Sequence, residues 1–123
     1  MVVSILNKVF VSDQYLEETN ILLVNFSDGT AQAFDLTQRI PDRIRSAIAL
    51  DNHLLQLEFI NGEEKHYNMS NRLTGVFSFL KDIDEFKKVK LIHDGKAIGW
   101  EHQNEMFDIW TDSLYFHSYP LID

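Results

Sequence analysis

The sequence predicts an α+β fold in a single domain over residues 1–123, built mainly from antiparallel β-hairpins. Three observations support this fold class. A strand-rich segment occurs twice at a spacing of 33 residues. Each copy carries a turn-forming dipeptide between two apolar runs. The last third of the chain has the charge pattern of a short helix, followed by a third hairpin and a helical turn.

The repeat relates residues 22–40 to residues 55–73. Seven positions are conservative replacements, and four are identical between the copies: Leu22/Leu55, Phe26/Phe59, Gly29/Gly62 and Arg39/Arg72. Such self-similarity predicts one structural unit used twice, each unit being a strand followed by a hairpin. It says much about the fold and little about the activity.

The first unit, residues 1–40, is expected to open with a strand over residues 2–11 and a long connection over residues 12–20. In the second unit the counterpart of this strand is residues 44–50. Both stretches are rich in β-branched and apolar residues, which favour strands. Pro41 marks the break between the two units.

The two hairpins are expected to turn at Asp28-Gly29 and at Asn61-Gly62. These dipeptides tolerate the positive φ that both central residues of a type I′ turn require. In the second copy Leu55, Leu57 and Phe59 alternate with polar residues, which is the period of a half-buried strand. We therefore predict two β-hairpins of the same design.

In the last third, residues 82–89 carry acids first and lysines last, an order that stabilises a short helix through its dipole. A third hairpin is predicted around Asp94-Gly95, between residues 90–93 and 97–100. A short strand over residues 106–109 and a capped helical turn over residues 111–115 complete the prediction. Four apolar residues are expected to cover one face of the sheet: Phe79, Leu80, Ile83 and Phe86.

The composition narrows the function classes. With a net charge of −8 the chain is a poor match for a nucleic-acid backbone, since that binding rests on neutralising phosphates. Its acidity either serves solubility or offers an acidic face to a basic partner protein. The absence of cysteine excludes disulfides and thiol chemistry and fits a reducing, cytoplasmic location. No apolar run approaches the ~20 residues of a membrane span, so no membrane partner is expected.

Residues 44–116 contain a further pattern of apolar, glycine and acidic positions. Its parts are Leu57-x-Phe59-x-x-Gly62, Tyr67-Asn68-Met69-Ser70, Gly75-Val76-Phe77-x-x-Leu80-x-Asp82, Phe86-x-x-Val89, Gly95-x-x-Ile98-x-Trp100 and Asp108-Ile109-x-x-Asp112-Ser113-Leu114-Tyr115. In order and spacing this segment resembles domain-of-unknown-function family 2442, a family of small bacterial domains.

The resemblance implies a small cytosolic α+β module, in a family whose members often lie near toxin–antitoxin-type genes and are sometimes joined to a helix-turn-helix domain. It implies no established activity. This chain differs from the pattern by its extra front unit, residues 1–40, and by the lack of a following helix-turn-helix segment, which argues against a transcription role. Residues 101–105 stand where a glycine is expected, so this loop is expected to be remodelled.

No residue set in the sequence resembles a reaction centre. The chain lacks the G-x-S-x-G, G-x-x-x-x-G-K and G-x-G-x-x-G motifs, and we predict no catalytic residue, no metal ligand and no cofactor. One alternative stays open, in which His93 and His102 meet across the third hairpin and serve a small metal- or ligand-dependent enzyme. A DNA-associated regulator is a further alternative, and it lacks a basic groove.

Trp110 is the strongest candidate for a contact with a partner. It occupies a position that is usually polar in the resembling domains, and exposed aromatic residues dominate protein interfaces. Burial in the core is the competing interpretation. The predicted partner-binding set joins Trp110 to four polar residues: Glu101, His102, Glu105 and Asp112.

The leading hypothesis is a non-enzymatic protein-binding module, antitoxin-like or inhibitor-like. This hypothesis includes a phage or mobile-element origin of the chain. Its acidic surface predicts a partner protein with a basic surface, and no nucleic acid. An exposed edge strand would also allow a homodimer, because its unpaired backbone groups accept another strand.

Overall fold

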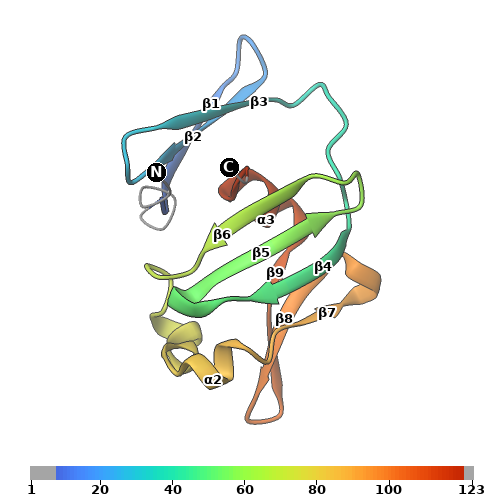
Figure 1. Cartoon of the computed structure of the whole chain (residues 1–123). Coiled ribbons are helices and arrows are strands. Elements are labelled where there is room, and N and C mark those ends of the chain that lie inside the picture. The colour runs from blue at the N-terminus through green and yellow to red at the C-terminus, as the bar shows by residue number, and fades with distance from the viewer. Residues whose placement is uncertain (1–7, 121–123) are drawn as a thin grey trace.

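The computed structural model describes residues 8–120 and has the predicted α+β fold (Figure 1). Within these residues, ten strands form three antiparallel sheets. The first sheet holds β1 (Phe10–Leu16), β2 (Ile21–Phe26) and β3 (Ala31–Asp35), in that order. The second holds β4 (Ile44–Ala49), β5 (Leu54–Phe59), β6 (Glu64–Asn68) and the short β10 (Tyr119–Pro120), which pairs with β6.

The third sheet contains β7 (Lys90–Ile92), β8 (Ala97–His102) and β9 (Glu105–Trp110), as an antiparallel meander. Helix α2 (Ile83–Phe86) precedes this sheet and helix α3 (Thr111–His117) follows it directly. Short 3₁₀ turns lie at Asp51–His53, Gly75–Lys81 and His93–Gly95. Within residues 8–120, no helix has the length and hydrophobicity that crossing a membrane requires.

The two repeated hairpins turn in the same way, down to their hydrogen bonds. The amide of Gly29 donates to the carbonyl of Phe26 at 3.1 Å, and the amide of Gly62 donates to the carbonyl of Phe59 at 2.9 Å. Both glycines have a positive φ, 88° and 91°, whereas the residue before each does not. The type I′ prediction is therefore wrong, because only one left-handed residue is present, as in a hairpin loop that ends in a glycine bulge.

Side chains repeat along with the backbone. The Oδ1 atom of Asp28 accepts a hydrogen bond from the amide of Thr30 at 3.0 Å, and Oδ1 of Asn61 accepts one from the amide of Glu63 at 3.0 Å. The same contact recurs after each hairpin, at 2.9 Å in both cases, in the pairs Asp35/Thr37 and Asn68/Ser70. The sequence repeat thus corresponds to a repeated three-dimensional unit.

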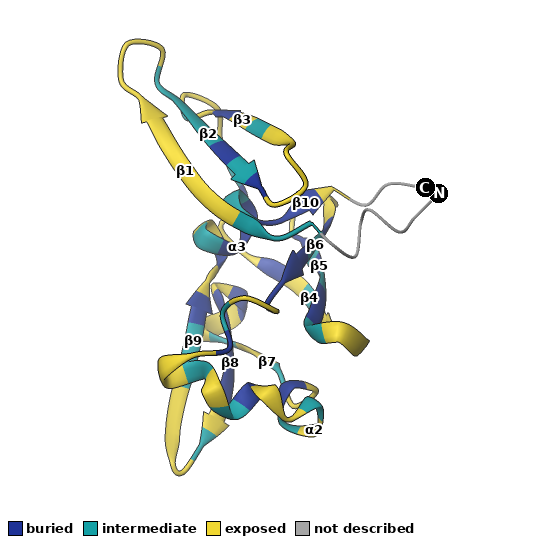
Figure 2. Ribbon diagram, turned by 90° about the vertical axis from the view of Figure 1, so that its left-hand side faces the viewer, coloured by how far each residue is buried: buried dark blue, intermediate teal, exposed yellow. Residues whose placement is uncertain are grey.

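The first strand is displaced from its predicted position. Residues 2–7 of the expected strand lie outside the described residues, and β1 runs from Phe10 to Leu16, through the segment predicted as a long connection. Only Glu17–Asn20 remains as the turn to β2. Apart from half-buried Phe10, every residue of β1 is exposed, so this edge strand needs no apolar face, and its sequence lacks the apolar alternation that would predict a strand (Figure 2).

The predicted covering of a sheet face is observed in part, and it lies on the third sheet, where the rings of Phe79 and Phe86 stack on His102 and Trp100. Leu80 and Phe86 are fully buried, while Phe79 and Ile83 are only half-buried at the edge of the core. Trp100 links this covering segment to the third sheet, since its indole Nε1 donates to the carbonyl of Phe86 at 2.8 Å. Asp82 begins α2 by accepting a hydrogen bond from the amide of Asp84.

The first sheet packs on the C-terminal segment of the chain through aromatic contacts. The rings of Phe34 and Tyr115 lie 5.5 Å apart, and those of Phe26 and Tyr119 lie 5.8 Å apart, edge to face. Buried side chains of all three sheets form one connected cluster. The seam between the first sheet and α3 is therefore part of the core.

Lys65 lies inside this seam. It stands opposite Leu57 on the core-facing side of β6, and only 1% of the residue is exposed. Its Nζ donates to the carbonyl of Tyr115 at 3.0 Å and lies 3.8 Å from the centre of the Tyr115 ring and 4.8 Å from that of Phe34. Burial lowers the pKa of the Lys65 amine from 10.5 to about 8, although the charge of Glu63 opposes this shift.

The third hairpin forms where it was predicted, with an unusual turn. His93, Asp94 and Gly95 have φ values of 53°, 60° and 84°, so three consecutive residues are left-handed. This turn presses against the start of β4, and a Cβ atom on Gly95 would lie 2.8 Å from the carbonyl oxygen of Ile44. The third sheet is thereby held close to the second.

Candidate partner-binding site

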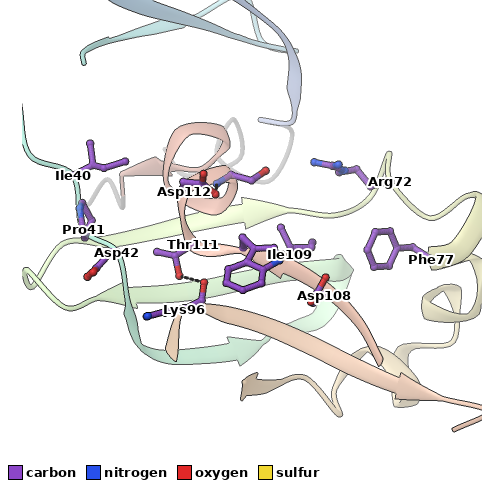
Figure 3. A pocket seen from close by; sticks show the side chains of 12 residues that line it. Ile40, Pro41, Asp42, Arg72, Phe77, Lys96, Asp108, Ile109, Thr111 and Asp112 are labelled. Carbon is purple, nitrogen blue, oxygen red and sulfur yellow. Dashed lines mark hydrogen bonds between the residues drawn. The ribbon is translucent and has the colours of Figure 1, made fainter. Parts of the chain in front are cut away.

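A pocket of about 740 Å³ lies between α3, the end of β9 and the linker (residues 36–43) that joins β3 to β4 (Figure 3). We call it the junction pocket. Five apolar residues contribute to its walls: Ile40, Pro41, Phe77, Ile109 and Trp110. Its volume and its largely apolar lining fall in the range of pockets that bind ligands or partner side chains.

Charged residues surround this apolar surface, and acids outnumber bases: Asp42, Asp108 and Asp112 against Arg72 and Lys96. Among the described residues, neither Asp42 nor Lys96 makes an ion pair within 4.0 Å. Their charges are open to a ligand, since no ion pair with a described residue neutralises them.

Arg72 is committed to an internal contact instead. Its Nη1 donates to the hydroxyl of Tyr67, and its guanidinium lies 6.0 Å from the centre of the Tyr67 ring. Asp108 lies 3.9 Å from Nε2 of His93. The contact with Tyr67 holds Arg72 in place at the wall of the junction pocket, and Asp108 lies beside His93.

Trp110 is exposed over 47% of its surface, so the core-burial interpretation is wrong. It is the last residue of β9, and its neighbour Ile109 points into the core, so the alternation of the strand turns the indole outward. The indole stacks on the ring of His93, with centroids 5.1 Å apart and an angle of 5° between the planes. This stacking fixes the orientation of the exposed ring.

The wall behind Trp110 is anchored by the first residue of α3. The hydroxyl of Thr111 donates to the carbonyl of Lys96 at 2.7 Å, and its amide donates to the same oxygen at 2.9 Å (Figure 3). Thr111 is 2% exposed. Two hydrogen bonds to one carbonyl tie the start of α3 to the turn before β8, which makes this part of the junction pocket preorganised.

The predicted partner-binding set falls into two groups. Trp110 and Asp112 line the junction pocket, whereas Glu101, His102 and Glu105 lie at the opposite end of the β8–β9 hairpin. Glu105 and Trp110 are the two ends of β9, five residue steps apart, which corresponds to a distance of about 17 Å. The set is therefore not one contiguous site.

The second group is engaged in local contacts. Glu101 pairs with Lys90 at 3.6 Å, and the ring of His102 stacks on Phe79 with centroids 4.2 Å apart. Glu105 is exposed, and it stands opposite His102 in the backbone register of the β8–β9 hairpin.

His93 and His102 do not meet as the enzyme alternative requires. They lie at opposite ends of β8, so its six residues place them about 17–20 Å apart. His93 stacks on Trp110 and His102 stacks on Phe79. Within residues 8–120, no group of three His, Cys, Asp or Glu side chains could hold a metal ion.

Sequence reasoning missed the half of the junction pocket that the linker, Arg72 and Phe77 supply. The sequence did single out Pro41, as the break between the two units, but a break in the pattern does not show which residues pack beside it. The sequence also singled out Arg72, as the repeat partner of Arg39. Only the folded arrangement brings residue 40 next to residue 110.

No protein-family model matches this chain, and neither the curated proteins nor the solved structures contain a match to it.

Proposed function

We propose that this chain is a non-enzymatic protein-binding module, antitoxin-like or inhibitor-like, whose partner presents a basic surface. The observation that carries the proposal is Trp110, an exposed and stacked indole at a pocket with three carboxylates. A rigid aromatic anchor next to a preformed pocket is the arrangement in which a few residues supply most of the binding energy.

Two further features support this proposal. The net charge of −8 favours association with a positively charged protein, because complementary charge speeds the encounter and selects among partners. The resemblance of residues 44–116 to domain-of-unknown-function family 2442 supports a role beside toxin–antitoxin-type genes. An inhibitor that covers a basic active surface would need this combination of acid and aromatic groups.

Replacing Trp110 with alanine is expected to weaken the captured partner's binding about 30-fold, which corresponds to about 2 kcal/mol for an aromatic anchor. The full chain would be used to co-purify partners from its native host, and the affinity of the recovered protein would then be measured by calorimetry. Because the indole is half exposed, thermal stability should change little.

Tyr15→Ala is the matched control, since Tyr15 is an aromatic residue with 52% exposure on the edge strand β1, on a different sheet. It should leave the affinity unchanged. Recovery of no specific partner would contradict the proposed function. Loss of binding in Tyr15→Ala with retention in Trp110→Ala would move the interface to the edge of the first sheet.

A further inference from the structure

We propose that the junction pocket receives an arginine or lysine side chain of the partner, held between the indole of Trp110 and the carboxylates of Asp42 and Asp112. This inference rests on the proposed function and specifies the chemistry of the partner. It uses three residues from three separate elements, namely β9, the linker and α3.

The indole lines the pocket and has one face that no other ring covers among the described residues. His93 stacks on Trp110 nearly in parallel, and His93 is not among the residues that line the junction pocket. His93 covers one face of the indole, which leaves the opposite face for a ligand in the pocket that Trp110 lines. A tryptophan face is the best aromatic surface for a cation, because the ring carries negative charge density above its plane.

Two carboxylates complete the arrangement. Asp42 comes from the linker, and the exposed Asp112 comes from the first turn of α3, so they stand on different walls of the pocket (Figure 3). Neither forms an ion pair with a described basic residue. One Oδ1 of Asp112 accepts from the amide of Ser113 at 2.7 Å, which leaves its second oxygen for a ligand.

The balance of charge favours a cation over an anion. Three carboxylates and two basic groups line the pocket, and Arg72 is turned to the hydroxyl of Tyr67. An anion would meet Lys96 and Arg72, but it would also face all three carboxylates, within a chain of charge −8. A basic side chain also carries an apolar stem, which Ile40 and Phe77 can cover.

The test uses the two tryptophans of the chain as reporter and internal control. In a ¹⁵N-labelled sample, the indole N–H signals of Trp110 and Trp100 are followed while N-acetyl-arginine amide is added. Trp110 should shift in a saturable way, and Trp100 should not, because it is 1% exposed and donates to a backbone carbonyl. N-acetyl-citrulline amide, a neutral analogue of similar shape, should bind about fivefold more weakly.

Variants test the two carboxylates. Asp42→Asn and Asp112→Asn should each weaken the arginine probe about two- to fivefold, the size of a partly exposed ion pair. Glu17→Gln removes the same charge from the β1–β2 turn, outside the pocket, and should have no effect. Equal loss in all three variants would overturn the inference, since it would show attraction to net charge alone.

Other outcomes separate this inference from the proposed function. Equal binding of arginine and citrulline probes, or no shift of Trp110, would overturn the basic-side-chain inference. If a partner were still captured through Trp110, the proposed function would stand without the basic-side-chain inference. A specific arginine response with no captured partner would support the ligand chemistry and contradict the proposed function.

Discussion

Gly95→Ala is expected to lower the free energy of unfolding by about 3 kcal/mol, the sum of a backbone penalty and a steric one. Gly95 has a φ of 84°, where a Cβ atom clashes with the chain's own carbonyl. The added methyl would also lie 2.8 Å from the carbonyl oxygen of Ile44. That oxygen belongs to the backbone of β4, so the third sheet would have to move away from the second.

Gly29→Ala separates the two contributions. Gly29 has nearly the same φ, 88°, but nothing lies within 4 Å of the position of its Cβ. Its substitution should cost about 1 kcal/mol, from the backbone alone. Urea unfolding followed by tryptophan fluorescence measures both variants. Equal costs for Gly95→Ala and Gly29→Ala would show that the contact with β4 does not constrain the fold.

Lys65→Met is expected to stabilise the protein by about 2 kcal/mol at pH 7. A pKa lowered from 10.5 to about 8 corresponds to a cost of about 3 kcal/mol for carrying the charge in the folded state. Methionine keeps the unbranched apolar stem and lacks only the terminal amine, and the lost hydrogen bond costs about 1 kcal/mol, which leaves the net gain of about 2 kcal/mol. The Tyr115 carbonyl retains a donor, because the hydroxyl of Ser118 lies 3.3 Å away.

The dependence of stability on pH tests whether the buried charge of Lys65 is what destabilises the folded state. Below about pH 8 Lys65 is protonated in both states, so the folded state bears the whole cost. Between about 8 and 10.5 the unfolded chain holds more protons than the folded one, so the stability of the wild type rises with pH. Lys65→Met should lack this rise.

Lys65→Ala serves as the comparison, since it removes the charge and also leaves a cavity, so it should gain less stability than Lys65→Met. Glu63 and Tyr115 are the ionisable neighbours of the amine, and burial together with Glu63 raises the pKa of Tyr115 to about 12. Destabilisation by Lys65→Met at pH 7 would show that the aromatic rings more than offset the burial of the charge.

Local chemistry made the repeated units predictable. Gly29 and Gly62 stand where the chain needs a left-handed residue, and that need is visible in the sequence. The type of turn was not predictable from the sequence, because it depends on how many residues the loop leaves unpaired. The start of β1 was missed for a related reason, since an exposed edge strand has no apolar alternation to reveal it.

The candidate site was predictable only where one residue departs from its surroundings. Trp110 was found by its residue type, and Asp112 was included because it lies two residues further along the sequence. Glu101 and Glu105 were grouped with them by proximity along the chain, but an extended strand carries neighbours apart at about 3.3 Å per residue. The linker wall of the pocket depends on packing between residues 40 and 110, which no local pattern encodes.

The meander topology of the three sheets has a consequence for how the chain folds. With the exception of β10 on β6, each strand pairs with its neighbour in sequence among the described residues, so the contact order of each sheet is low and its formation is fast. The bond from Lys65 to Tyr115 closes a separation of 50 residues. Closure of that aromatic seam, after the hairpins have formed, is therefore the step that should set the overall rate of folding.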